Sequence, residues 1–167
     1  HNAVFVGKDK DGQPRYACLR GIGTDFKGEA TGSDKRFSFS IPAEESSQVL
    51  YLFESAIDLL SFAAMAQEDR LPWRAQHLLS LAGVYQPKKN LTERPLPLAL
   101  SQYLRDHREI QTIYLCLDND LAGRSAADAI RQQLAGRYVV LDGFPCQGKD
   151  YNDWLCLRKG LPITRTV

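Results

Sequence analysis

The sequence predicts an α/β protein: a parallel sheet of about four strands with helices on both faces, preceded by a small antiparallel β subdomain. After Val49, short apolar runs alternate with segments of helical spacing, as expected for right-handed βαβ units. Before Pro42, partial two-residue alternation with turn residues is typical of an antiparallel hairpin. The polar stretch 43–48 separates the two patterns. We therefore expect a β subdomain over 1–46 and an α/β domain over 47–167.

The individual elements follow from local pattern. The N-terminal part has two runs around Asp11-Gly12, a loop at 29–35 and an alternating segment at 36–42. Four short apolar runs have the composition of buried parallel strands, and they lie at 49–53, 77–84, 112–117 and 137–144. Helical spacing predicts helices at 55–67, 96–107, 122–135 and 150–160.

Length and composition are those of an ordinary globular domain, with 167 residues, 44% of them apolar and 25% charged. The chain has no signal-peptide pattern and no apolar stretch of membrane-spanning length, so we expect a cytoplasmic protein without a membrane partner. The four cysteines form no Cys-x-x-Cys pair, which argues against a structural zinc site and for free thiols in a reducing compartment. A first residue that is His1 rather than Met leaves open whether the sequence is a piece of a longer protein.

Charge is unevenly distributed, although the net charge is only +1. Between Arg70 and Arg108 there are seven Lys and Arg residues against two acids, and Lys88 and Lys89 belong to this basic run. A basic surface around an acidic centre suits a metal-dependent site for a phosphate-bearing polymer. Basic residues that only solvate helix faces and loops would have the same composition.

Acidic side chains follow three of the predicted strands. Glu54 comes directly after the first strand, Asp118 and Asp120 come after the third, and Asp150 and Asp153 follow the fourth after a short loop. Because sites in open α/β sheets form beyond the carboxyl ends of the strands, we expect these acids to share one site. Local explanations exist as well, since Asp120 is also suited to cap the next helix and Glu54 to lie in a first helical turn.

The chemistry of these residues favours a hard divalent cation. Alternation on an extended segment lets Asp118 and Asp120 project to the same side. Mg²⁺ (or Mn²⁺) takes carboxylate and water oxygens and neutralises charge on a phosphoryl oxygen, with Glu54 as the acid–base candidate. An EF-hand calcium loop is excluded, because Ala122 and Ala129 stand where it needs oxygen ligands.

These motifs resemble the Toprim domain of bacterial primases, type IA and type II topoisomerases and OLD-type nucleases. The family has a Glu at the end of the first strand and Asp-x-Asp at the end of the third, here Glu54 in "LFESAIDLLSF" and Asp118 and Asp120 in "LCLDNDLAGRSAA". The bacterial-primase variant adds an acid four residues after the Glu, matched by Asp58, and an acidic motif matched by "GKDYNDWL". In that last motif Asn152 stands where the family has an Asp.

The resemblance covers about Val49 to Leu157 and implies a Rossmann-like Toprim fold with Mg²⁺-dependent chemistry on nucleic acid, with single-stranded DNA and other domains or replication proteins as partners. The implied catalytic residues are Glu54, Asp118 and Asp120. The implied metal ligands are these three together with Asp58 and Asp150. The segment "FKGEATGSDKRFSFSIP" resembles a small β domain of unknown function that precedes Toprim-like domains in bacterial mobile-element and plasmid proteins.

Basic residues next to the acids predict phosphate contacts. Arg124 lies in the first turn of the helix after Asp-x-Asp, where a positive charge is unfavourable for the helix itself. The alternative for Arg124 is an ion pair with Asp120 or Asp128. The predicted phosphate or nucleic-acid contacts are Arg124, Lys149, Lys88 and Lys89.

Several functions share these features. Primase-like nucleotidyl transfer and nuclease action differ only in the attacking group, a sugar hydroxyl or water, so both stay open. A topoisomerase needs a tyrosine nucleophile, which seven scattered tyrosines do not identify. A haloacid-dehalogenase-type phosphatase also has a strand ending in Asp-x-Asp, but only 47 residues follow Asp120. A non-catalytic nucleic-acid or protein-binding module with this fold is the remaining alternative.

Overall fold

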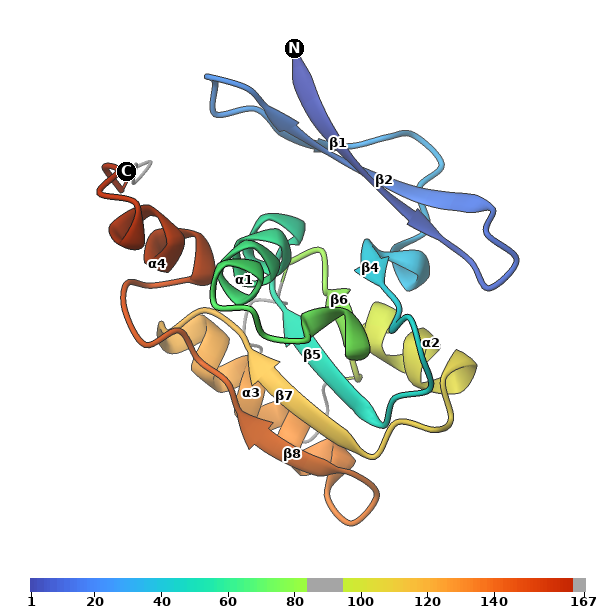
Figure 1. The fold of residues 1–167 in the computed structure, drawn as a ribbon. Helices are drawn as coiled ribbons and strands as arrows, with labels where there is room; N and C mark the ends of the chain where they lie inside the picture. The colour runs from blue at the N-terminus through green and yellow to red at the C-terminus, as the bar shows by residue number, and fades with distance from the viewer. Residues whose placement is uncertain (84–94, 164–167) are drawn as a thin grey trace.

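The computed structural model describes residues 1–83 and 95–163, whose strands form two sheets (Figure 1). The first is a three-stranded antiparallel sheet close to the N-terminus. The second has five strands, four of them parallel, and apolar layers cover both of its faces. The predicted fold class, an α/β domain with a small antiparallel β part before it, is therefore confirmed.

The N-terminal sheet is built around a tight turn. Its strands, in spatial order, are β1 (Asn2–Lys8), β2 (Pro14–Gly21) and β3 (Lys27–Glu29). In the turn between β1 and β2, the Asp9 carboxylate accepts hydrogen bonds from the backbone N–H groups of Asp11 and Gln13. Gly12 has φ of +77° there, a left-handed conformation that glycine adopts without a steric penalty.

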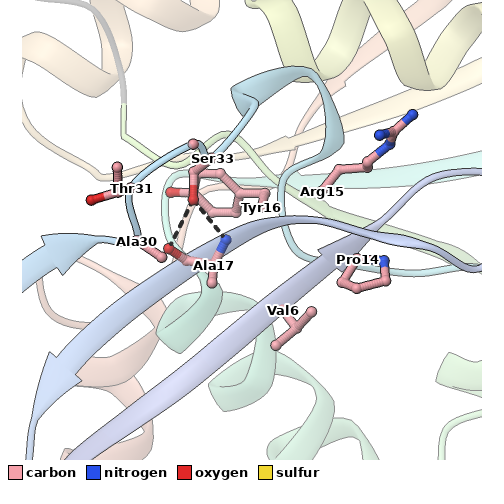
Figure 2. Close-up of a pocket in the computed structure, with 9 residues that line it drawn as sticks. Val6, Pro14, Arg15, Tyr16, Ala17, Ala30, Thr31 and Ser33 are labelled. Atoms are coloured by element: carbon pink, nitrogen blue, oxygen red, sulfur yellow. Dashed lines mark hydrogen bonds between the residues drawn. The ribbon is translucent and has the colours of Figure 1, made fainter.

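A shallow pocket of about 280 Å³ lies on this sheet, between β1, β2 and the segment 30–33 (Figure 2). Within it, Ser33 Oγ accepts a hydrogen bond from the Ala17 N–H group at 3.1 Å and donates to the Ala17 carbonyl at 3.4 Å. None of the residues that line the pocket belongs to the acidic motifs. The pocket is therefore separate from the predicted site.

The segment 36–42 differs from the single alternating strand that its sequence predicts. It is occupied by a one-turn 3-10 helix, η1 (Lys35–Phe37), and a two-residue strand, β4 (Ser40–Ile41). β4 pairs antiparallel with β6 (His77–Ser80), so the sheet has a fifth, antiparallel edge strand beyond the four that were predicted. Phe39 packs against the apolar core at this position, which explains why the short strand stays with the main sheet.

The central strands of the main sheet are apolar on both sides. The order is β4-β6-β5-β7-β8, in which β5 is Val49–Phe53, β7 is Thr112–Cys116 and β8 is Val139–Asp142. In β5, Leu50 and Leu52 belong to one apolar layer, and Tyr51 and Phe53 to the other. Because both faces of the strand are covered, its sequence is a continuous apolar run, as expected for a buried parallel strand.

Within the described residues, four α-helices supply those layers (Figure 1). They are α1 (Ala56–Glu68), α2 (Leu98–Asp106), α3 (Leu121–Leu134) and α4 (Tyr151–Arg158), and a short η2 (Trp73–Ala75) precedes β6. Leu100 of α2 and Ile130 of α3 pack in one layer, while Leu59 of α1 and Tyr151 of α4 pack in the other. All four helices lie within two residues of their predicted bounds. None of the helices in the described ranges is long and apolar enough to cross a membrane.

Candidate acidic site at the carboxyl edge of the sheet

The parallel register places the predicted acids at one edge of the main sheet. Phe53 of β5 pairs with Cys116 of β7, so Glu54 and Asp118 leave the sheet at the same edge, just beyond those partners. The Glu54 carbonyl also accepts a hydrogen bond from the Gly83 N–H group at 2.9 Å, which holds the turn after β6 against this edge. Three strand ends therefore contribute to one location.

Asp118 and Asp120 share one cation, the ammonium group of Lys149. Lys149 Nζ lies 2.9 Å from Asp118 Oδ2 and 3.2 Å from Asp120 Oδ2. The Asn119 N–H group donates to the Lys149 carbonyl at 2.6 Å, so the two loops are joined by their backbones as well. The hydrogen bond between the Lys149 ammonium group and Asp118 is the main cause that raises the pKa of Lys149, and it keeps this side chain charged. An arrangement that holds an ammonium between two carboxylates also has the charge to hold a metal ion.

Asp120 has a second role as the N-cap of α3. Its Oδ1 accepts a hydrogen bond from the Gly123 N–H group at 2.8 Å. Burial alone would raise the pKa of Asp120, but the hydrogen bond from Gly123 and the neighbouring Lys149 outweigh burial and lower it. Gly123 packs directly on the loop, since an added Cβ would lie 2.1 Å from the Asp118 carbonyl oxygen. A glycine here lets the helix begin close to the acids.

Glu54 is a partly buried titratable group of this site. Burial raises the pKa of Glu54 to about 7, and the negative charge of Asp118 adds to that effect, while Lys149 acts in the opposite direction. Asp120 and Asp58 raise it further. A carboxyl group with this pKa exchanges a proton close to neutral pH, which is the property that a general acid or base requires.

Asp58 is buried and is held by protein donors. Ser55 caps α1: its Oγ accepts from the Asp58 N–H group at 3.2 Å and donates to Asp58 Oδ2 at 2.5 Å. The Asn152 N–H group donates to Asp58 Oδ1 at 3.3 Å. Burial raises the pKa of Asp58 to about 6, and Ser55 opposes that rise. Asp58 therefore connects the start of α1 to the start of α4.

At the start of α4, as at the start of α1, the N-cap side chain accepts a hydrogen bond from the N–H group of an aspartate three residues later. Asp150 caps α4 by accepting from the Asp153 N–H group at 2.7 Å, and Asp153 Oδ2 accepts from the Lys149 N–H group at 3.0 Å. Gly148 adopts φ of +75°, and a Cβ there would lie 2.5 Å from Asp153 Cβ. Burial is the main cause that raises the pKa of Asp150. Asp150, which was predicted as a metal ligand of the site, thus serves as a helix cap.

Ser55 holds the site and was not predicted as part of it, whereas Asp153 was predicted among the acids of this edge and holds the loop before α4. Each belongs to a pair spaced by three residues at a helix start, Ser55 with Asp58 and Asp150 with Asp153. This is the spacing of a capping box, so the sequence does contain a signal for them.

The predicted phosphate-binding cations have different surroundings. Arg124 donates to the Asn119 side-chain oxygen, and its guanidinium lies 5.0 Å from the centre of the Phe144 ring. The alternative partner Asp128 pairs instead with Arg131, at 2.8 Å. Lys149 bridges the two aspartates as described above. The other two predicted contacts, Lys88 and Lys89, lie outside the described residues.

The donor set at this edge fits a hard cation. In the ranges 1–83 and 95–163, no three of these acids bring one oxygen each within 4.8 Å of one another. Mg²⁺ is commonly bound through one or two carboxylates with the remaining positions filled by water and phosphate, so a wider spacing is compatible with it. The residues that could hold such an ion are Glu54, Asp118 and Asp120. The ammonium group of Lys149 shows where a positive charge already balances the two aspartates.

The fold is similar to that of the primase fragment of the bacteriophage T7 primase-helicase. The TM-score is 0.59 at 19% identity, over 94% of this chain and 58% of that chain. Primase domains bound to an RNA/DNA hybrid and dTTP, in a structure with T7 lagging-strand DNA polymerase, give a TM-score of 0.58 at 19% identity, over 94% of this chain and 70% of the other. At this level of identity the likeness establishes the fold.

Comparison of sequences identifies the family. A 65 kDa protein of Zymomonas mobilis subsp. mobilis is 27% identical over 174 residues, which cover 98% of this chain and 28% of that protein. Residues 1–46 match the family described as "Protein of unknown function (DUF3991)". Residues 51–155, more than half of the chain, match the family model described as "Toprim-like", and the protein therefore belongs to the Toprim-like family.

Proposed function

We propose that the acidic edge is a Mg²⁺- or Mn²⁺-dependent catalytic site that acts on nucleic-acid phosphodiesters, by primase-like nucleotidyl transfer or by nucleolytic cleavage. One observation carries this proposal: Glu54, with a pKa of about 7, lies beside an aspartate pair that holds the ammonium group of Lys149. A proton-exchanging carboxyl next to a cation site is the combination that phosphoryl chemistry requires. Membership of the Toprim-like family agrees with it.

Each residue has a distinct part in this proposal. Asp118 and Asp120 would hold the ion, and the ion would supply positive charge to neutralise a phosphoryl oxygen. Glu54 completes the ligand set or accepts the proton of the attacking hydroxyl or water. Asp58 and Asp150 are engaged by backbone donors and position the helices on which the site depends.

The proposed substrate polymer is single-stranded DNA, and the proposed protein partners are neighbouring domains or replication proteins. Arg124 projects from the first turn of α3, where the helix N-terminus itself attracts anions. Lys149, whose ammonium group now pairs with the two aspartates, would be free to contact a phosphate if these carboxylates held a metal ion instead. The chain corresponds to only 28% of its curated relative, which supports a role beside other domains.

The test is a pair of assays with Mg²⁺ or Mn²⁺: nucleotide incorporation on a single-stranded DNA template, and cleavage of end-labelled DNA. We expect product in one assay, lost on chelation and reduced at least about 100-fold by Glu54→Gln or Asp118→Asn, because removing an acid–base group costs about 10²–10⁴. The control is Glu45→Gln, which changes an exposed carboxylate in the loop before β5. Activity that survives both site variants would refute the catalytic assignment.

A non-catalytic binding module is the second candidate, and Lys149 is the observation that favours it. An ammonium fixed between Asp118 and Asp120 neutralises the pair without a metal ion. This candidate predicts no product in either assay, together with nucleic-acid binding whose affinity falls steeply as salt rises. Fluorescence anisotropy at low and at physiological salt measures it, and a flat salt response would exclude phosphate contacts.

A further inference from the structure

A second group of potential ligands lies at the opposite edge of the main sheet. His77 is the first residue of β6, His107 is the C-cap of α2, and Glu109 lies in the turn between α2 and β7. Because β6 and β7 both run parallel to β5, their amino ends meet at the edge that faces away from Glu54 and Asp118. The group is therefore separate from the acidic site.

The spacing of the three side chains suits one transition-metal ion. In the part of the chain that the structure describes, they form the only group of three His, Cys, Asp or Glu residues with one ligand atom each within 4.8 Å of the others. Glu109 Oε1 lies 3.6 Å from His77 Nε2 and 3.2 Å from His107 Nδ1. Tetrahedral zinc with bonds of about 2.0–2.2 Å places its ligand atoms about 3.3–3.6 Å apart, so these two separations need little change.

His77 provides an independent indication of a ligand. His77 is buried, with 3% of the residue exposed, yet Nε2 has no hydrogen-bond partner, and within the described ranges only one other buried side-chain atom is in that state. Buried polar atoms almost always have a partner, so this nitrogen needs an explanation. Nε2 faces the Glu109 carboxylate, at the position where a shared ion would lie.

The other ring nitrogen of His77 is placed to orient the ring. Nδ1 lies 3.0 Å from the Tyr103 hydroxyl, and with the hydrogen on Nδ1 donated to that oxygen, Nε2 presents a bare lone pair. The Ala43 N–H group lies 3.4 Å from Nδ1, at the long limit of a hydrogen bond, and opposes this tautomer only weakly. Metal-bound histidines usually have such a partner on the second nitrogen.

Charge and exposure are also compatible with metal binding. Burial is the main cause that lowers the pKa of His77, and the charge of His107 adds to it, while Glu109 and the Ser47 carbonyl act in the opposite direction. His77 is therefore neutral at neutral pH, the form that binds a metal. His107 and Glu109 have 25% and 39% of their side chains exposed, which gives an ion access from solvent. A hydrogen bond between His107 and Glu109 alone would leave His77 Nε2 unexplained.

We propose that His77 Nε2, His107 Nδ1 and Glu109 Oε1 bind one Zn²⁺ ion, with a fourth position open to water. Two imidazoles and one carboxylate are a donor set that zinc favours, whereas the all-oxygen acidic edge suits Mg²⁺. The ion joins the end of α2 and the turn after it to the start of β6. The proposal of this zinc site does not depend on whether the acidic edge is catalytic.

The test is a titration of metal-depleted protein with Zn²⁺, followed by calorimetry and by thermal unfolding. We expect one ion per chain and a higher melting temperature. His107→Ala and Glu109→Gln each weaken Zn²⁺ binding by at least about 100-fold, since loss of even an outer partner costs about 10–100-fold. Both residues are partly exposed, so the variants keep the fold. Tyr103→Phe, which removes the orienting hydroxyl, weakens binding by about 10–100-fold.

Three controls separate this site from other zinc-binding groups. Asp106→Asn removes an exposed carboxylate next to the cluster and leaves Zn²⁺ affinity unchanged. His1→Ala removes the remaining histidine of the chain, and Glu54→Gln removes the raised-pKa carboxyl of the acidic edge. Binding that survives His107→Ala and Glu109→Gln, or that is lost in His1→Ala or Glu54→Gln instead, overturns the proposal. Cobalt as a substitute gives a second measurement, because visible absorption of a four-coordinate ion must disappear in the same two variants.

Discussion

Lys149 shows how one side chain links the charges of the acidic edge. The sequence suggests a phosphate contact for it, and the structure pairs it with Asp118 and Asp120. The phosphate contact and the ion pair with the aspartates belong to different states of the site, one with a metal ion bound and one without. An ammonium group and a metal ion would compete for the same carboxylate oxygens. With no metal bound, Lys149 offsets the repulsion between the two carboxylates.

Replacing Lys149 by Met tests this competition. Without metal, we expect the free energy of unfolding to fall by at least about 0.5–1 kcal/mol, the range for an exposed ion pair, because Lys149 is half-exposed while Asp118 is buried. Removing the competitor should strengthen Mg²⁺ binding by about 2–5-fold, which is the same energy expressed as affinity. Urea unfolding with chelator and with Mg²⁺ measures both effects. Lys35→Met, which breaks a surface pair with Glu29, is the control and should leave Mg²⁺ binding unchanged.

Glu54 makes stability depend on pH in an unusual direction. Its pKa is about 7 in the folded protein against an ordinary value of 4.5. Between these pH values the folded state binds more protons than the unfolded state, so this residue's contribution to the free energy of unfolding rises as pH falls from 7 to 4.5. Carboxylates in ion pairs have the opposite dependence.

Glu54→Gln removes that dependence. In the presence of chelator, urea unfolding of the wild type and the variant at pH 8, 7, 6 and 5 should show a difference that shifts in favour of the wild type as pH falls. Taking the difference cancels groups that both proteins share, such as His77, whose lowered pKa has the reverse effect. A difference that stays constant over this pH range would show that Glu54 titrates at its ordinary pKa.

At the scale of elements, helix starts organise the acidic edge. Ser55 caps α1, Asp120 caps α3 and Asp150 caps α4, and each cap lies in the loop that carries an acid of the site. The local explanation for Asp120 as a cap and the functional explanation as a cation ligand are therefore compatible. A carboxylate can accept from a backbone N–H group and still offer its second oxygen to a cation, as Asp120 does with Lys149.

Gly123→Ala tests the tight start of α3. The added methyl group would lie 2.1 Å from the Asp118 carbonyl oxygen, so the backbone of the loop must move. We expect a loss of about 1–3 kcal/mol in unfolding free energy, as for overpacked interiors, and weaker Mg²⁺ binding because Asp118 is displaced. Ser125→Ala in the same helix is the control, with a change within about 0.5 kcal/mol. A stable Gly123→Ala protein with unchanged metal binding would contradict this account.

At the scale of the whole molecule, the two sheets are joined through the segment around β4. Phe39 contacts Phe5 of the N-terminal sheet edge-on, with ring centres 5.7 Å apart, and also packs against the core of the main sheet. Gly7 of β1 lies so close to η1 that a Cβ would be 1.8 Å from the Phe37 carbonyl oxygen. Residues that match the N-terminal family thus also complete the α/β sheet.

Two deletions test this connection. Removing residues 1–33 leaves η1 and β4 in place, and we expect cooperative unfolding to persist. Removing residues 1–46 also takes away Phe39 and Ile41 and uncovers the edge of β6, at an additional cost of about 2–3 kcal/mol for partly buried apolar side chains. Urea unfolding of both fragments measures the difference. Equal stability would show that β4 contributes nothing to the main domain.

Most of the α/β architecture was predictable because it depends on local patterns. The apolar run of β5 and the helical spacing of α1 and α3 are properties of adjacent residues, and their bounds agree with prediction to within two residues. β6 was predicted to extend to residue 84 but ends at Ser80, because Ala82 and Gly83 adopt positive φ. The apolar composition of residues 77–84 gives no signal for the turn that follows Ser80.

The sequence alone determined the fold class, the family and the edge of the sheet where the acids lie, because strand ends and motif spacing are local in the chain. Only the tertiary structure decided which side chains meet. It placed Lys149 between Asp118 and Asp120, and it brought His77 to His107 and Glu109. The absence of Cys-x-x-Cys pairs argued against zinc, but histidines 30 residues apart form a common site only when β6 and α2 pack together. Contacts between distant segments depend on packing, which no local pattern encodes.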